Sequence, residues 1–224
     1  NMLSLKQGLS LDSIRVQGAW SPDDETSLEA WYQNAVGITL NGSDVSQWDD
    51  SSTNTNNLTQ TTASRQPAYS LGVLTFDGTS HNMASSQMNI DNDFTIGIRG
   101  DFSGFPSSGT LLGDDDAGNA FLKLQSSTVL RLKVAAGLVD FTLSSGSFGD
   151  GYIVMTRDSS DNVDAYYNGT SISATQVRSN RVKIDNLGYS VTAGYFNGTI
   201  KEVQIYTSTS AALTANINSR LASL

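Results

Sequence analysis

Runs of aspartate are the side chains in this sequence that are best suited to chemistry. Asp114, Asp115 and Asp116 are consecutive, Asn119 follows them, and further aspartates gather at 158–164. Calcium binds roughly six to eight oxygen atoms from carboxylates, carbonyls and water, so such loops are candidate calcium sites. No segment matches an EF-hand loop, and solvated acidic loops are the favoured interpretation, with a calcium site as the alternative. We predict Asp114 and Asp116 as metal ligands, with Ca²⁺ as the candidate cofactor.

Catalytic arrangements of side chains are not recognisable in the sequence. A glycosidase needs two carboxylic acids, one that protonates the leaving group and one that attacks or activates water. The three glutamates form no such array, and Asp91 and Asp93 belong to an Asp-Asn-Asp sequence that is typical of a turn. His81 is the only histidine, and no serine lies in a nucleophile-elbow sequence. We therefore expect no enzymatic activity.

Charge and composition limit the expected partners. The 224 residues include 22 acidic and 13 basic side chains, which gives a net charge of −9. This charge repels polyanions within a Debye length of about 8 Å at physiological salt, so we expect no nucleic acid partner. No apolar run approaches the ~20 residues of a membrane span, and we see no secretory signal. The absence of cysteine leaves the redox compartment open.

Alternation of apolar and polar residues predicts strands along most of the chain. Leucines between 122 and 132 alternate with Lys123, Arg131 and Lys133. A period of two with one polar face is typical of half-buried antiparallel strands, so the three cations should lie on a solvent-facing side. Solubilising decoration is the favoured interpretation of this basic face, and a contact with an anion or an acidic glycan is the alternative. Many short strands separated by turn residues predict an all-β, antiparallel sandwich. Further alternating runs lie at 73–76, 94–98, 152–156, 163–167 and 200–206.

Helix signals occur in two places. Pro22 follows a serine and precedes two aspartates, as at a helix start. Near the C-terminus, Thr214 can cap a turn in which Ile217 and Leu221 share one face. The stretch 28–32 fits the period of a helix and that of a strand, so periodicity alone leaves it undecided.

Several motifs, taken in order, resemble a known family. The stretches are SLEAWYQNAVGITLNGSDVSQWDDS, LTFDGTSHNM, GYIVMTRDSSDNVDAYYNG and YFNGTIKEVQIY. Together they resemble the laminin-G-like, concanavalin A-type jelly-roll modules of tailed-phage virion proteins. The resemblance covers roughly 28–224 and implies about 12–14 strands, short helical turns only, and a strand at 28–32. Residues 19–224 are then one jelly-roll domain, and 1–18 are a leader or docking arm.

The resemblance also implies a binding function. Such modules hold ligands on the concave sheet or at the loop rim, and they often hold one calcium ion. For Trp48, at a strand end, core packing is the favoured interpretation and a sugar-stacking platform is the alternative. Tyr166 and Tyr167 are adjacent, so one faces inward and the other is the binding candidate. The candidate ligand-binding residues are Trp48, Asp49, Asp114, Asn119, Tyr166 and Tyr167.

We therefore expect a non-catalytic carbohydrate-binding or host-recognition module of a phage virion, of the tail-fibre or decoration type. Its partners would be a glycan and other virion proteins, at the virion or extracellular surface, with a homo-oligomer as one arrangement. A purely structural virion protein is the alternative, and an unrecognised glycoside hydrolase or polysaccharide lyase ranks below it. An exposed aromatic ring in a polar groove would favour sugar binding, whereas a broad apolar patch would favour protein contacts.

Overall fold

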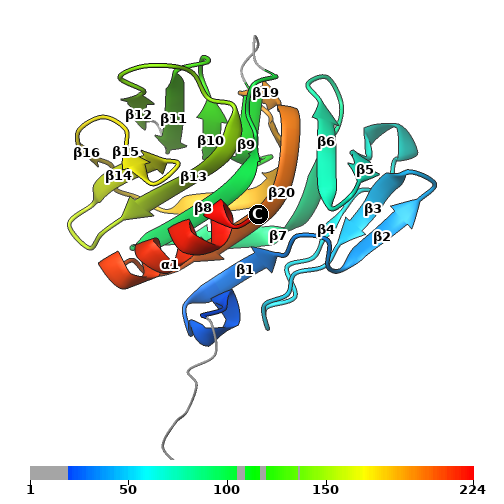
Figure 1. Cartoon of the computed structure of the whole chain (residues 1–224), viewed down its shortest axis with the longest axis horizontal. Helices are drawn as coiled ribbons and strands as arrows, with labels where there is room; N and C mark the ends of the chain where they lie inside the picture. The colour runs from blue at the N-terminus through cyan, green and yellow to red at the C-terminus, as the bar shows by residue number, and fades with distance from the viewer. Residues whose placement is uncertain (1–19, 105–108, 117–119, 136) are drawn as a thin grey trace, which may run out of the picture.

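The computed structural model describes residues 20–104, 109–116, 120–135 and 137–224; the predicted leader 1–18 and Asn119 lie outside the described residues. The described residues form 20 strands, two short 3₁₀ helices (η2, Pro22–Asp24; η3, Ala63–Arg65) and one α-helix. The predicted all-β, antiparallel fold is confirmed (Figure 1). The expected 12–14 strands were too few, because the chain adds several two-residue strands at sheet edges and in loops.

The first of two layers is built around β20 (Asn197–Tyr206), the longest strand. One edge of β20 pairs with β8, while the other edge pairs first with β6 and then with β1, which lie end to end. Next to β8 come β13 and β14, and two short strands extend β14. The bounds are β1 (Leu28–Tyr32), β6 (Val73–Asp77), β8 (Phe94–Asp101), β13 (Asp150–Arg157), β14 (Asn162–Tyr167), β15 (Thr170–Ser171) and β16 (Gln176–Val177).

The second layer runs in the order β3, β4, β7, β17, β9, β10, β11 and β12, and β2 pairs with β3. Strand β5 pairs with both β3 and β6, so it joins the layers into one hydrogen-bonded network. The bounds are β2 (Ile38–Asn41), β3 (Asp44–Trp48), β4 (Leu58–Thr59), β5 (Ala68–Ser70), β7 (Met83–Ile90), β9 (Gly109–Gly113), β10 (Phe121–Leu124), β11 (Val129–Val134), β12 (Gly137–Thr142) and β17 (Val182–Leu187). A separate hairpin is formed by β18 (Tyr189–Ser190) and β19 (Gly194–Tyr195).

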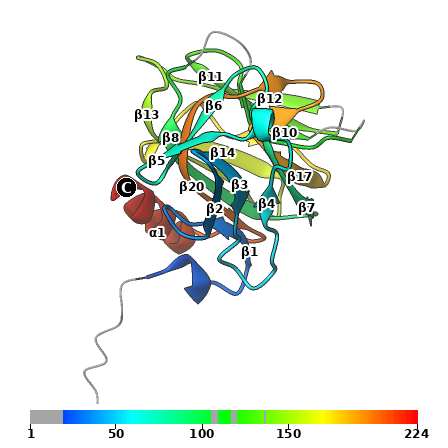
Figure 2. The same cartoon turned by 90° about the vertical axis from the view of Figure 1, so that its right-hand side faces the viewer.

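Apolar side chains fill the space between the layers as one core cluster, to which most strands contribute every second residue. The predicted alternation at 122–132 is confirmed, because all four leucines there are buried in this cluster. A second cluster lies on the outer side of the first layer, under the α-helix. The view in Figure 2 places this helix on one side of the molecule and β7 and β17 towards the other.

Helix α1 (Ala211–Ala222) confirms the predicted C-terminal helix, but the predicted cap was wrong. Ser210 is the N-cap, because its hydroxyl accepts a hydrogen bond from the Leu213 N–H at 3.0 Å. Thr214 already lies in the first turn and donates to the Ser210 carbonyl. The helix has 12 residues, which is longer than the short turns expected. Among the described residues, no helix combines the length and the apolar character that a membrane crossing requires.

A buried carboxylate ties α1 to the centre of the first layer. Glu202 on β20 is completely buried and accepts two hydrogen bonds from the guanidinium of Arg220. The Trp31 indole N–H, the Asn34 backbone N–H and the Gln204 amide also donate to Glu202. Five donors therefore surround one negative charge, and Arg220 supplies the only countercharge that pairs with it among the described residues.

Candidate functional site

Trp48 belongs to the core, as the favoured interpretation predicted, so the alternative role in ligand binding was wrong. Its side chain is 0% exposed, and its indole N–H donates to the carbonyls of Gln33 and Val36 at 3.1 Å each. The ring packs against Tyr32 with 5.8 Å between centroids. Asp49 follows at the end of β3 and accepts a hydrogen bond from the Gln47 amide at 2.6 Å. This corner of the sandwich presents no aromatic face of Trp48 to a ligand.

The two adjacent tyrosines face opposite sides of the first layer, as predicted from strand geometry. Tyr167 packs against the core between the layers, edge-on to Phe148 at 5.0 Å, and its hydroxyl accepts a hydrogen bond from the Gly149 N–H at 2.8 Å. Tyr166 lies on the outer side, beside the cluster under α1. Tyr167 is thus a packing residue, and Tyr166 is the outward member of the pair.

Tyr166 lines a polar groove of about 430 Å³ between the β13–β14 hairpin and α1. The floor comes from the strands, where Thr156 is paired with Asp164, two residues before Tyr166. Helix α1 packs on the sheet through Leu213, Ile217 and Leu221, so its apolar stripe is turned away from the groove. The wall of the groove is the neighbouring stripe of small and polar residues, Ala211, Thr214, Ala215 and Asn218.

Polar atoms of the groove are only partly satisfied by the protein. The Asn218 side-chain oxygen is buried and has no hydrogen-bond partner among the described residues. Asp164 accepts a hydrogen bond from the Thr175 hydroxyl at 2.6 Å. Burial, together with the negative charge of Asp164, raises the pKa of Tyr166, so its phenol stays neutral. The groove therefore combines an aromatic ring, free amide capacity and a carboxylate.

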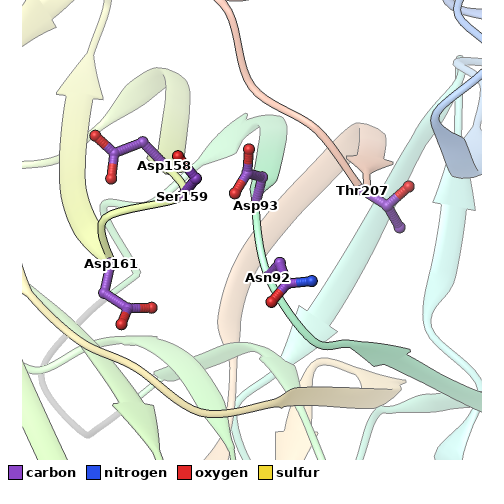
Figure 3. Close-up of a pocket in the computed structure, with 6 residues that line it drawn as sticks. All are labelled: Asn92, Asp93, Asp158, Ser159, Asp161 and Thr207. Atoms are coloured by element: carbon purple, nitrogen blue, oxygen red, sulfur yellow. The ribbon is translucent and has the colours of Figure 1, made fainter.

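A second hollow of about 340 Å³ adjoins the groove and shares Asp158 with it. Figure 3 shows its carboxylates, which come from the β13–β14 turn and from the link before β8. The residues that line it are Asn92, Asp93, Asp158, Ser159, Asp161 and Thr207.

The charge of this hollow balances a buried arginine. Arg157 is 0% exposed, donates to the Asn92 and Asn180 carbonyls, and lies over the Phe94 ring at 5.0 Å. Burial lowers the pKa of Arg157, while Asp161 and two further aspartates act in the opposite direction. Because these carboxylates remain at the surface, this end of the groove disfavours anionic ligands.

The predicted metal residue Asp114 lies elsewhere, in a carboxylate cluster at the end of β9. Ligand oxygens of Asp114, Asp115 and Asp185 all lie within 4.8 Å of one another. Asp114 is 0% exposed, and its Oδ2 has no hydrogen-bond partner among the described residues. Its Oδ1 accepts from the Asp116 N–H at 3.0 Å. A buried, unpaired carboxylate oxygen is costly, so this cluster has the donor set that fits a hard cation such as Ca²⁺.

Asp116, the second predicted metal ligand, does not belong to this cluster, so that part of the prediction was wrong. Its carboxylate is directed to Lys183, at 3.7 Å from the ammonium. Asp185 takes its place and had not been recognised. The signal was a break in alternation, because two polar residues, Asp185 and Asn186, stand together between buried apolar ones. That break is a β-bulge, where the register with β7 shifts between Ile184 and Asn186.

Proton binding to Asp185 should compete with metal binding. Burial raises the pKa of Asp185 to about 6 from 3.8, and the nearby Asp115 adds to this shift. Hydrogen bonds from the Asn186 amide, at 2.7 Å, and from the Asp115 N–H, at 3.1 Å, act against it. At neutral pH the cluster is therefore negatively charged, and its carboxylates repel one another. A bound cation would remove this repulsion.

We expect Asp185→Asn to stabilise the metal-free protein at pH 7. The folded state holds the Asp185 proton more tightly than the unfolded state, so wild-type stability is lost as pH rises from about 4 to about 6. Removing the charge should restore about 1–2 kcal/mol, less than the full shift implies because solvent screens the exposed Asp115. Chemical denaturation at pH 4.5 and pH 7 in EDTA measures the difference.

Calcium should make the wild type more stable than Asp185→Asn, which is the opposite of the order in EDTA. It should raise the melting temperature of the wild type at pH 7, less so below pH 6, and should leave Asp185→Asn unchanged. Asp116→Asn is the matched control and should keep the calcium response. A wild type without any shift up to about 10 mM calcium would exclude a calcium site of the weak extracellular type.

No family model matches the sequence, and no curated protein matches it. Solved structures do resemble the fold. A Trypanosoma rangeli sialidase superposes with a TM-score of 0.60 at 14% sequence identity, over 88% of this chain and 33% of the sialidase. The binding domain of botulinum neurotoxin serotype G gives a TM-score of 0.54 at 13% identity, over 77% of this chain and 47% of that domain.

These similarities concern the fold, because the sequence identities are low. The chain spans about a third of the sialidase and about half of the toxin domain. They agree with the antiparallel β-sandwich that the strand pairings of this chain form.

Proposed function

We propose that the protein is a non-catalytic carbohydrate-binding module and that its sugar site is the groove beside α1. One observation carries this proposal: the Tyr166 ring borders a polar groove of about 430 Å³, within the roughly 300–1,000 Å³ of small-molecule sites. A sugar presents an apolar face to an aromatic ring and hydroxyl groups to polar atoms around it. The arrangement of Tyr166, Asp164 and Asn218 matches both requirements.

The ligand class follows from charge. Asp164 lies in the groove and further carboxylates line the adjoining hollow, so the site favours neutral or amino sugars over acidic ones. The Asn218 amide and the Asp164 carboxylate would hydrogen-bond sugar hydroxyls while the ring of Tyr166 stacks on the sugar. A longer saccharide would extend past Asp158 into the hollow of Figure 3.

In more detail, the module would recognise the host as part of a phage virion, and the carboxylate cluster would hold calcium. The virion setting is supported by the resemblance of the sequence motifs, and the ion by the unpaired oxygen of Asp114. Lack of catalysis is supported by the engagement of groove carboxylates in structural contacts, since Asp158 accepts from the Ser160 and Asn162 N–H groups. Single sites should bind at about 1 mM to 1 μM, so recognition would need several copies.

We expect Tyr166→Ala to weaken sugar binding about fivefold to tenfold. The loss corresponds to the roughly 1 kcal/mol that an aromatic face contributes beyond buried area. A glycan array identifies the ligand, and titration of backbone amide shifts then gives the dissociation constant. Tyr166→Phe keeps the ring and should bind within about twofold of the wild type.

The controls separate a lost site from a lost fold. Tyr166 also contacts the cluster under α1, so the melting temperature of each variant must be measured beside its affinity. Asn218→Leu changes the groove wall without touching the ring and should weaken binding as well. A silent glycan array, or binding that survives both Tyr166→Ala and Asn218→Leu, would rule out this groove and favour the structural alternative.

A further inference from the structure

Two lysines share one aromatic ring on the outer face of the second layer. The ammonium groups of Lys123 on β10 and Lys133 on β11 lie 5.2 Å and 5.7 Å from the centroid of the Phe121 ring. Both lysines face away from the core, because Leu122 and Leu132, which precede them on the two strands, are buried in the core cluster. Among the described residues, neither ammonium forms an ion pair with a carboxylate.

The surroundings of the two lysines add one further cation, Arg131, and one carboxylate, Asp140, whose negative charge partly opposes the lowering of the Lys123 pKa. Arg131 lies directly opposite Lys123 in the register, but its guanidinium is held by both oxygens of Asp140. Lys123 is only 8% exposed, although we expected it to face solvent freely. It is flanked by β9 and β11 and packs over Phe121, and burial followed by the charge of Arg131 lowers its pKa. Three cations therefore face one carboxylate on a protein of net charge −9.

Unused hydroxyl groups lie on the same face. Thr110 on β9 is the register partner of Lys123, is 0% exposed, and its Oγ1 has no hydrogen-bond partner among the described residues. Ser190 is also 0% exposed, and its Oγ is likewise unpartnered. The β18–β19 hairpin brings Ser190 over Gly113, where an added Cβ would lie 2.8 Å from the Ser190 Cβ. Thr110 is thus the β9 neighbour of Lys123, and Ser190 lies over Gly113, which is the β9 neighbour of Phe121.

We propose that this face is an anion-binding site for a carboxylate or sulfate group, formed by Lys123 and Lys133 with Thr110 and Ser190 as hydroxyl donors. An anion between the two ammonium groups would remove their mutual repulsion and give both a charged partner. It would also offer an acceptor to buried hydroxyls that otherwise have none. The site lies on the sheet opposite the Tyr166 groove, so it takes acidic groups that the groove disfavours.

The test is a titration of the whole chain, freed of metal ions and kept in chelator-free buffer, with sodium glucuronate, sodium sulfate and, as the uncharged control, glucose. The backbone amides of Thr110, Gly113 and Ser190 should shift saturably with at least one of the anions and not with glucose. Saturation by glucuronate alone would assign a carboxylated sugar, and saturation by sulfate alone would assign a sulfate or phosphate ester. No saturation up to about 100 mM, well above the millimolar range, would overturn the proposal.

Variants separate a built site from general charge. Lys123→Met with Lys133→Met should weaken binding at least tenfold, because methionine still covers Phe121 but carries no charge. The matched control, Arg181→Met with Lys183→Met, removes the same charge from the same layer and should stay within twofold. Equal losses in both would overturn the proposal. Lys133→Met alone, at the more exposed position, should weaken binding at least threefold and serves if the double variant unfolds. Tyr166→Ala should leave anion binding unchanged, which keeps this test independent of the sugar groove.

Discussion

Replacing Arg220 by methionine should lower the free energy of unfolding by about 3–5 kcal/mol. Glu202 is completely buried, and Arg220 gives it two hydrogen bonds and a countercharge. Without Arg220, the carboxylate would either remain charged without compensation or take up a proton, and both are costly. Arg220 also lies 4.8 Å from the Trp31 ring, so its loss uncovers that ring. Denaturant unfolding followed by tryptophan fluorescence measures the change.

A double variant tests this explanation of the loss. Glu202→Gln combined with Arg220→Met removes both charges, and it should be clearly more stable than Arg220→Met alone. The deficit of the single variant should also shrink as the pH falls, since protonation then removes the unpaired charge. Arg181→Met breaks an ion pair with Asp91 in which both side chains are more than half exposed, so it should change stability by less than about 1 kcal/mol. A similar small effect at Arg220 would show that the pair is not buried in solution.

Replacing Trp48 by alanine should cost about 3–5 kcal/mol and should not change the ligand affinity of the folded protein. Trp48 is among the largest fully buried side chains, so its removal leaves a cavity between the layers. It also leaves the carbonyls of Gln33 and Val36 without their donor. Thermal and chemical unfolding measure the loss, and titration of the remaining folded protein measures the affinity.

Trp48→Phe is the conservative control and should lose less than half as much, because the phenyl ring retains most of the packing against Tyr32. If Trp48→Ala had little effect on stability but abolished sugar binding, the ring would be a ligand platform after all. A loss of stability with unchanged affinity would therefore show the core role, and a loss of affinity with unchanged stability would show the binding role.

Local patterns were enough to predict the strands with clear alternation, but not β7, β9 or β17. Alternation at 122–132 placed every leucine inward, because the side-chain period of a strand is two regardless of its partners. The same logic predicted that Tyr166 and Tyr167 would separate. The helix cap was missed because Ser210 and Thr214 are both good caps, and only the entry of the chain into α1 selects Ser210.

The candidate site was harder to predict because it depends on contacts between distant segments. Asp185 meets Asp115 only because β17 pairs with β9, and a sequence pattern does not specify that pairing. The groove at Tyr166 exists because α1 covers one part of the sheet and leaves another uncovered. Trp48 was ambiguous since a tryptophan at a strand end can close the core or face a ligand, and its neighbours from other strands decide which.

The position of β20 has a consequence for how the chain folds during synthesis. The strand at the centre of the first layer is also the last of the described strands in chain order, and it pairs with β8, β6 and β1. Leu28 is paired with Tyr206, and β20 is the only partner of β1 among the described strands. Strand β1 therefore cannot join the sheet until residues up to 206 have been synthesised. Such long-range pairing makes folding slow, because the chain loses the entropy of loop closure before the stabilising contacts form. A nascent chain on the ribosome should therefore remain sensitive to protease until β20 has emerged, and should then become resistant in a single late step.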